Sequence, residues 1–214
     1  QIDQAYIGNY VITNDVPDGM HNSMLPMFLT MSAYVGAMIA AMQLVQAYKQ
    51  SRGKASRFKL FSYVQISALI IAVVSSIFAV GISFLIADLN SDILLQVFGQ
   101  QTLTYFVAFN FCAIFTFLVG EAGMILNIPV LLTQTIANGA TMPREMMDGY
   151  FYVASYITPM YHAVQSNLAV MFGSTAQSPF VWGLVSVGLA ALLINFLIVT
   201  FLHKKEPTTK QIIQ

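Results

Sequence analysis

The sequence predicts an all-α integral membrane protein with five transmembrane helices and an outer helical hairpin of the re-entrant or interfacial kind. Of the 214 residues, 57% are hydrophobic and only 8% are charged, whereas a soluble domain is about 25% charged. Apolar runs long enough to cross a bilayer alternate with short polar connections. Eight of the nine basic residues lie in the connection at residues 47–60 and in the C-terminal tail, and such segregation of positive charge is typical of multi-pass membrane proteins.

Residues 1–23 are predicted to form the end of an extracytoplasmic region or stalk. This segment contains three aspartates and no lysine or arginine, and it includes the turn signal Val-Pro-Asp-Gly at residues 16–19. The chain begins without an initiator methionine or a signal-peptide pattern, so we expect it to be part of a longer protein. A helix that enters the bilayer from outside needs an earlier span to deliver its start there. We therefore also expect an N-terminal transmembrane helix upstream.

The membrane domain is predicted to cover residues 24–202, and its first span covers residues 24–46. At about 1.5 Å per residue, this span is long enough for a hydrocarbon core of about 30 Å. Small residues recur along it at helical spacing and predict a helix-packing face. These residues are Ala33, Gly36, Ala37, Ala40 and Ala41. The face serves either general packing of the bundle or a specific homodimer contact.

The connection after the first span, residues 47–60, is basic and carries no acid. Its candidate docking residues are Lys49, Arg52, Lys54, Arg57 and Lys59. These residues fix the topology and contact anionic lipid headgroups, or they form a docking surface for a cytoplasmic partner such as a separate ATPase. Direct binding of nucleic acid is not expected from so short a segment beside a bilayer.

Four further spans are predicted at residues 61–87, 102–119, 122–137 and 180–202. The connection at residues 88–101 holds two aspartates and no base. The Gly-Glu-Ala-Gly sequence at residues 120–123 predicts a tight turn, in which Glu121 is either a turn acid or a proton or substrate site. Pro129 predicts a kink in the fourth span. No charged or strongly polar residue is expected deep in any span.

The distribution of basic residues predicts the orientation. The connection at residues 47–60 and the polar tail at residues 203–214 together hold eight of the nine lysines and arginines. Five spans place these two segments on the same side, and the positive-inside rule makes that side cytoplasmic. Arg144, the remaining base, falls on the opposite side. The N-terminus of this segment is therefore predicted to lie outside and its C-terminus in the cytoplasm.

The outer hairpin is predicted at residues 141–173, between the fourth and fifth spans. Pro143 suits the first turn of a helix, Pro159 breaks or kinks that helix, and Gly173 is placed to end a second one. The candidate residues of this hairpin are Pro143, Glu145, Tyr150, Pro159 and Tyr161. The hairpin either seals the outer mouth of the bundle or presents the polar residues 165–167 to a cavity or a partner.

No catalytic, cofactor-binding or metal site is expected, and we do not expect the chain to be an enzyme. The sequence contains no GxxxxGK[ST], GxSxG, HExxH or CxxC pattern. The three histidines, His21, His162 and His203, are scattered among outer and inner segments. The single cysteine, Cys112, lies within an apolar run and is expected to be a small buried hydrophobe.

The hairpin resembles a known pattern. Asn138-Gly139 is followed by Met-Pro-Arg-Glu at residues 142–145, an aromatic helix and Thr-Pro-Met-Tyr at residues 158–161. This order is similar to the outer helical hairpin of ABC-2-type exporter permeases, in which the segment also precedes the last span.

The start of the chain resembles the YhgE/Pip (phage infection protein) family, to which EsaA of type VII secretion is related. The matching segments are Val-Pro-Asp-Gly at residues 16–19, Leu-Pro-Met-Phe at residues 25–28 and Tyr-Val-Gly-Ala at residues 34–37. The chain departs from the family at residues 166–168, Ser-Asn-Leu, where the family has a Leu-Arg. A basic outer site is therefore not carried over.

This resemblance implies a protein of the Gram-positive plasma membrane, with one N-terminal span, a large extracellular region and a C-terminal block of five spans. It implies two functions. In the first, the chain is a membrane-anchoring, dimerising scaffold that serves as a phage receptor or as an accessory component of type VII secretion. In the second, it is an export permease that works with a separate ATPase. A permease is expected to present a short docking helix within residues 49–60 and a polar path between paired bundles. A scaffold is expected to show a tightly packed, closed dimer interface and a basic loop that is disordered or bound to lipid.

Overall fold

The computed structural model describes residues 20–86, 91–140, 142–173 and 176–203. Within these ranges the chain forms helices and 3₁₀ turns and no strand, which confirms the all-α prediction. Residues 1–19 of the stalk predicted at residues 1–23, residues 87–90 around Asp88 and the basic tail from residue 204 lie outside the described residues. Residues 20–23 of the predicted stalk are helical.

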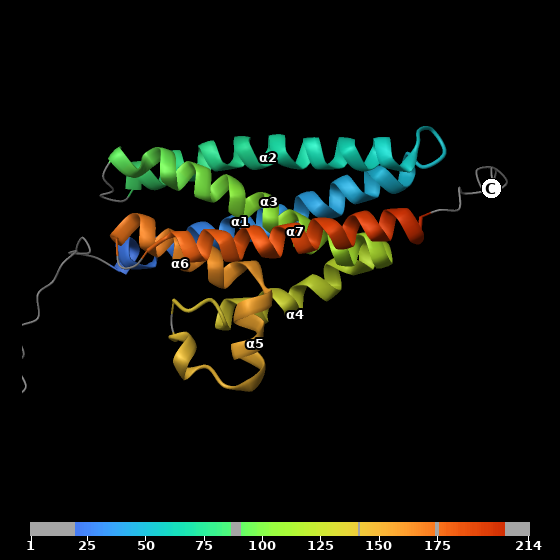
Figure 1. The fold of residues 1–214 in the computed structure, drawn as a ribbon. Helices are drawn as coiled ribbons and strands as arrows, with labels where there is room; N and C mark the ends of the chain where they lie inside the picture. The colour runs from blue at the N-terminus through green and yellow to red at the C-terminus, as the bar shows by residue number, and fades with distance from the viewer. Residues whose placement is uncertain (1–19, 87–90, 141, 174–175, 204–214) are drawn as a thin grey trace, which may run out of the picture.

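Four long helices run side by side: α1 (Met20–Gln50), α2 (Arg57–Ile86), α3 (Leu94–Val119) and α7 (Ser178–Phe201) (Figure 1). At about 1.5 Å per residue, even the 24 residues of α7 extend for about 36 Å. We call the end of the bundle that carries the loop at residues 51–56 the basic end. We call the opposite end, where α1 and α7 begin, the distal end.

Within the residues that the structure describes, four helical runs, rather than five, are long and apolar enough to cross a membrane. They are Met24–Gln50, Arg57–Ile86, Ser91–Ile136 and Ser178–Phe201. The predicted third and fourth spans both fall within the third of these runs, so the prediction of five spans is not confirmed. The fourth predicted span corresponds to α4 (Gly123–Ile136), whose 14 residues extend for only about 21 Å. That length is short of a hydrocarbon core of about 30 Å.

The third run reverses direction at the predicted tight turn. A 3₁₀ turn, η3 (Gly120–Ala122), joins α3 to α4. Asn127 donates a hydrogen bond from Nδ2 to the backbone oxygen of Cys112 at 3.1 Å, although the two residues are 15 positions apart, so α4 folds back along α3. A Cβ atom on Gly123 would lie 2.5 Å from the carbonyl carbon and oxygen of Phe115. Only glycine allows this close approach of the two helices.

The predicted hairpin contains two short helices, α5 (Gly149–Ile157) and α6 (Pro159–Phe172). Pro159 begins α6, and Gly173 ends it in the left-handed conformation with φ of 60°, as expected from their roles. Pro143 does not begin an α-helix, because only a 3₁₀ turn, η4 (Arg144–Met146), follows it before the backbone becomes extended at Met147.

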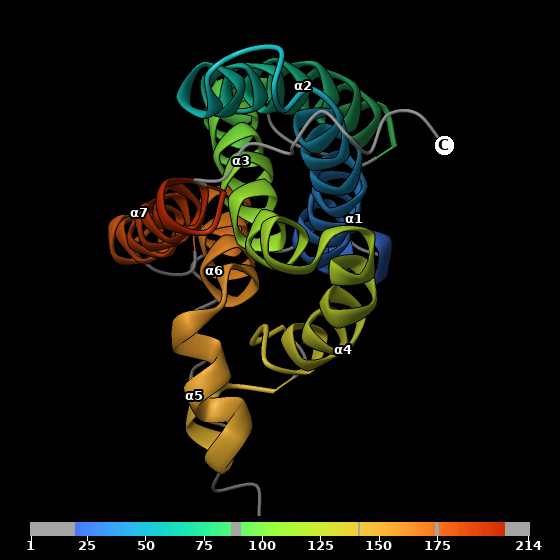
Figure 2. The ribbon, with the colours of Figure 1, turned by 90° about the vertical axis from the view of Figure 1, so that its right-hand side faces the viewer.

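The two helices of the hairpin lie in different surroundings. α6 packs against α1, α3 and α7 inside the bundle. α5 projects from the side of the bundle that is opposite to α2, next to α4 (Figures 1 and 2). The re-entrant or interfacial placement of the whole hairpin is therefore not confirmed. Instead, α4 leads away from the basic end and α6 leads to the distal end.

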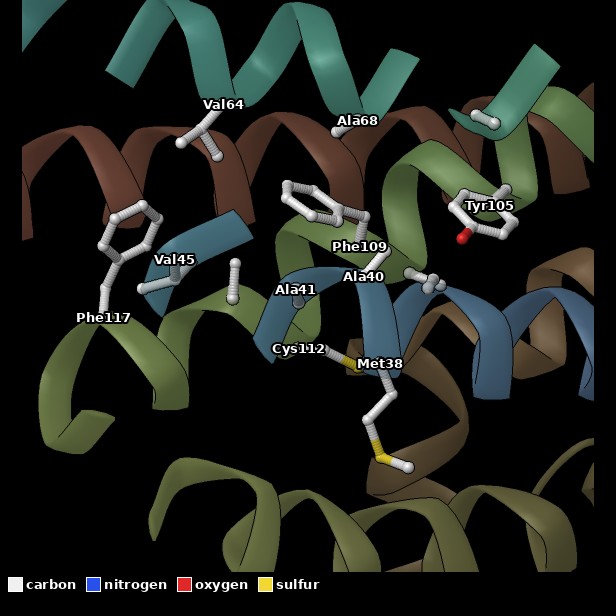
Figure 3. Packing of buried hydrophobic residues seen from close by; sticks show 14 of the residues in the cluster. Met38, Ala40, Ala41, Val45, Val64, Ala68, Tyr105, Phe109, Cys112 and Phe117 are labelled. Carbon is white, nitrogen blue, oxygen red and sulfur yellow. The ribbon is translucent and has the colours of Figure 1, made fainter. Parts of the chain in front are cut away.

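The main hydrophobic core lies where α1 and α3 meet beneath α2 (Figure 3). Alanines of α1 and α2 allow close approach, and the rings of Tyr105, Phe109 and Phe117 on α3 fill the space between the helices. Cys112 is fully buried in this core. A second cluster at the distal end joins Leu29, which lies on α1, to residues of α2, α3 and α6.

Candidate functional site

The structure divides the five candidate basic residues among different neighbours at the basic end. Lys49 in the last turn of α1 turns toward α3, where its Nζ donates to the backbone oxygen of Thr116 at 3.1 Å. This bond satisfies a carbonyl near the C-terminus of α3, where a positive charge is favourable. Arg52 lies in the loop, and its Nη2 donates to the backbone oxygen of His203 at 3.3 Å, just beyond α7. Lys54 is exposed.

Arg57 and Lys59 lie in the first turn of α2, and each packs on an aromatic ring of that helix. The Arg57 guanidinium carbon is 4.9 Å from the centroid of the Phe58 ring, and the Lys59 Nζ is 5.8 Å from that of Tyr63. Cation–π contacts of this kind hold the basic groups near the level where a helix leaves the bilayer.

The loop at residues 51–56 is a compact turn. Gly53 adopts φ of 91°, and the N–H of Lys54 donates to the backbone oxygen of Ser51 at 3.1 Å. α1 ends at Gln50 and α2 begins at Arg57, so these six residues contain no separate helix. The short docking helix expected of a permease is therefore absent from this loop.

Glu121 lies in the η3 turn at the basic end. Its side chain is exposed and accepts a hydrogen bond from Nε2 of Gln46 at 2.6 Å. This contact and the Lys49 bond described above fasten the α3–α4 turn to the end of α1. The geometry is that of a turn acid, because the carboxylate faces out of the bundle.

His203 follows α7 and packs against the end of α1. Its ring stacks on that of Tyr48 with centroids 5.6 Å apart, and its Nδ1 is 3.4 Å from the Tyr48 hydroxyl. Burial, together with the positive charges of Arg52 and Lys49, lowers the pKa of His203 from 6.5 to about 4. The imidazole is therefore neutral at pH 7.

The predicted helix-packing face of α1 packs against another helix of the same chain. Ala33, Ala37 and Ala41 are buried in the core shared with α3, as is Ala40. A Cβ atom on Gly36 would lie 3.1 Å from the Tyr105 ring of α3. These small residues therefore bring α1 and α3 together and are not exposed to a second copy.

The hairpin is held by a clamp around Arg144. Its guanidinium carbon lies 3.8 Å from the ring centroid of Tyr156 and 3.6 Å from that of Tyr161. Its Nε and Nη2 each donate to Ser155 at 2.9 Å, to the side-chain oxygen and the backbone oxygen respectively. Sequence reasoning noted Arg144 only as a charge, because the two tyrosines meet it through the fold.

The other candidate residues of the hairpin are dispersed. Pro143 and Glu145 are exposed, and the Tyr150 hydroxyl lies 3.2 Å from that of Thr133 on α4. Pro159 and Tyr161 are buried in the bundle. The structure therefore fastens α5 to α4 and α6, and does not bring these residues together as one site.

Strongly polar side chains lie deep in the bundle, so the prediction that none would do so is wrong. Gln134 of α4 donates to the Tyr34 hydroxyl of α1 at 2.7 Å and accepts from the N–H of Met160 at 3.4 Å. Asn195 of α7 donates to the backbone oxygen of Asn110 on α3 at 2.7 Å. Hydropathy averages concealed these residues because each stands alone in an apolar run.

The polar residues 165–167 also turn inward rather than toward a separate partner. Asn167 is fully buried and donates to the Thr30 hydroxyl of α1 at 3.0 Å. Ser166 is buried and accepts from Nε2 of Gln177 at 3.3 Å. We call the Asn and Gln side chains that join the helices in this way the polar seam. Its members are Gln101, Asn127, Gln134, Asn167 and Asn195.

The fold places the chain in the class of multi-helix membrane proteins. No protein-family model matches the chain. It is 25% identical over 230 residues to the uncharacterized protein YhgE of Bacillus subtilis (strain 168), and this match covers 98% of the chain but 28% of YhgE. The match supports membership of the YhgE family, as the resemblance at the start of the chain predicted.

Proposed function

We propose that this chain is the membrane-anchoring domain of a larger cell-surface protein and acts as a scaffold. The observation that carries the proposal is the packed interior of the bundle, in which side chains of the polar seam bond to neighbouring helices. Such bonds stabilise one arrangement of membrane helices. The chain spans 28% of the length of YhgE, which fits a domain that anchors a further region.

The finer parts of the proposal come from the family resemblance. The anchored protein serves as a phage receptor or as an accessory component of type VII secretion, as a homodimer in the plasma membrane of a Gram-positive cell. In this proposal the basic end lies in the cytoplasm, since the loop at residues 47–60 is rich in lysine and arginine. α4 and α6 together make one crossing, which restores the five passes that this orientation needs.

A second candidate is an export permease driven by a separate ATPase. The presence of polar side chains inside the bundle favours it, because a substrate path needs such groups. The compact loop at residues 51–56 counts against the permease, since it lacks a docking helix.

A pulldown of the full-length protein in mild detergent, followed by mass spectrometry and an ATPase assay, separates the two functions. A scaffold is expected to yield a homodimer alone or secretion components, without a stoichiometric ATPase. Recovery of a stoichiometric ATPase would overturn the proposal if binding is lost in the triple variant Lys54→Gln, Arg57→Gln and Lys59→Gln. The matched control is Glu145→Gln with Asp148→Asn, two exposed charges on the hairpin.

A further inference from the structure

Two hollows meet along α2 and α7 near the basic end. The first, of about 390 Å³, lies between the loop at residues 51–56, the first turn of α2 and His203, and we call it the basic pocket. The second, of about 640 Å³, is a groove between α2 and α7 with Phe106 of α3 on its floor, and we call it the apolar groove.

The pocket and the groove lie next to each other along α2 and α7. Leu60 lines the pocket and Phe61, the next residue of α2, lines the groove. The Phe58 ring in the pocket lies 5.8 Å from the Phe196 ring in the groove, centroid to centroid. A molecule with a polar head and a long apolar tail can therefore occupy both at once.

The basic pocket is suited to a phosphate group. Arg52 and Arg57 both line it, and no acidic side chain among the described residues does. Arginine presents several N–H donors in a plane that matches the oxygens of a phosphate. The Arg52 guanidinium is already oriented by its bond to the His203 carbonyl, and that of Arg57 by the ring of Phe58.

The apolar groove is suited to an acyl chain. It is lined by aromatic and aliphatic side chains and opens to the side of the bundle, where Ile66, Leu189 and Leu193 are 55%, 61% and 58% exposed. One amide, that of Gln65, lies in this lining. Both of its polar atoms are buried and have no hydrogen-bond partner within the part of the chain that the structure describes. Because these two atoms are buried, a molecule in the groove contacts the apolar lining and not the amide.

We propose that the basic pocket and the apolar groove form one site for an anionic glycerophospholipid of the bilayer. The phosphate lies between Arg52 and Arg57, and an acyl chain lies in the groove between α2 and α7. The site holds for a scaffold and for a permease alike, since it requires only that the bundle lies in a bilayer.

Native mass spectrometry of the full-length protein in neutral detergent tests this site. The protein is titrated with dioleoylphosphatidylglycerol and, separately, with dioleoylphosphatidylcholine. We expect one phosphatidylglycerol per chain to be retained in preference to phosphatidylcholine. Arg57→Gln is expected to weaken this binding about fivefold, the usual effect of one basic residue on an anionic lipid. Leu193→Trp, which fills the exposed side of the groove, is expected to weaken the binding of both lipids.

Two matched controls locate the effect. Lys54→Gln removes an exposed charge from the same loop, and Leu197→Trp enlarges a 42% exposed leucine of α7; neither residue lines the site. Both variants are expected to bind like the wild type, and circular dichroism checks that all four variants remain folded. Equal retention of the two lipids by the wild type, or equal losses in the test and control variants, would overturn the site. Full displacement of the lipid by sn-glycerol 1-phosphate would also contradict it, because the groove would then contribute nothing.

Discussion

The long helices form two pairs, α2 with α7 and α1 with the run that contains α3. Between these pairs, hydropathy and burial are related in the opposite way to that in a soluble protein. α2 and α7 have a higher mean hydropathy than α1 and the run that contains α3. Yet only 22% and 28% of the residues in the most apolar stretches of α2 and α7 are buried, against 50% and 56% in α1 and the α3 run. The more hydrophobic helices are therefore the more exposed ones.

The buried side chains of the bundle are therefore distinguished by being polar or small. Lipid tails are as apolar as leucine, so a bilayer gives no reason to bury large aliphatic side chains. A polar side chain in the same bilayer needs a partner, which it finds in the polar seam. Even α2 follows this rule, because Ala68, Ala72 and Ser76 are among its buried residues.

The largest expected difference in stability is between a glycine-to-alanine substitution at a buried helix contact and one on the exposed helix α2. Gly123→Ala places a Cβ atom 2.5 Å from the backbone of Phe115, so we expect a loss of about 3 kcal/mol in the free energy of unfolding. Gly81→Ala on α2 meets no atom within 4 Å and is expected to leave stability unchanged or to raise it by about 0.5–1 kcal/mol. Unfolding by SDS in mixed micelles measures both variants. Similar losses of unfolding free energy in the two variants would show that the two positions do not differ in packing.

A smaller effect is expected from the polar seam. Asn195→Ala removes the hydrogen bond from α7 to α3 at a fully buried position and is expected to cost about 1 kcal/mol, in the range measured for bonds between membrane helices. Leu197→Ala, two residues away on the lipid-facing side, serves as the control and is expected to cost less. The same SDS titration compares them. A larger loss of unfolding free energy for Leu197→Ala than for Asn195→Ala would contradict the proposal that the buried polar residue contributes more than the lipid-facing leucine.

The smallest effect is a dependence on pH at the junction of α7 with α1. The pKa of His203 is lowered to about 4 in the folded protein, whereas the pKa of a histidine in the unfolded chain is about 6.5. The stability that the neutral ring contributes is complete above pH 6.5 and is lost as the pH falls toward 4, because the unfolded chain then binds more protons. The midpoint of thermal unfolding in neutral detergent should thus decrease between pH 7 and 5. His203→Gln should make this decrease smaller. An unchanged dependence of the midpoint on pH in this variant would contradict the lowered pKa of His203 as its cause.

Much of the fold could be predicted because the signals are local. Apolar runs located the long helices, Pro159 and Gly173 marked the limits of α6, and the Gly-Glu-Ala-Gly sequence at residues 120–123 located the reversal between α3 and α4. The short length of α4 was visible in the sequence as well, but it was interpreted as a complete span.

The remaining features depend on contacts between distant segments. Asn110 and Asn195 are 85 residues apart, and no periodicity shows that they face each other. The clamp on Arg144 needs Tyr161 from another helix. The candidate lipid site combines a loop, α2 and α7, so only the basic half of it, at Arg52 and Arg57, could be inferred from the sequence.

We propose that the bundle crosses the bilayer with its basic end in the cytoplasm and its distal end outside. Cys112 is the single cysteine of the sequence and is fully buried, so this chain adds no labelling background of its own. Lys54→Cys and Ser178→Cys place one exposed thiol at each end. In intact cells, a membrane-impermeant maleimide is expected to label Ser178→Cys, and to label Lys54→Cys only after permeabilisation. Labelling of both positions from the same side, or of Lys54→Cys alone in intact cells, would contradict this arrangement.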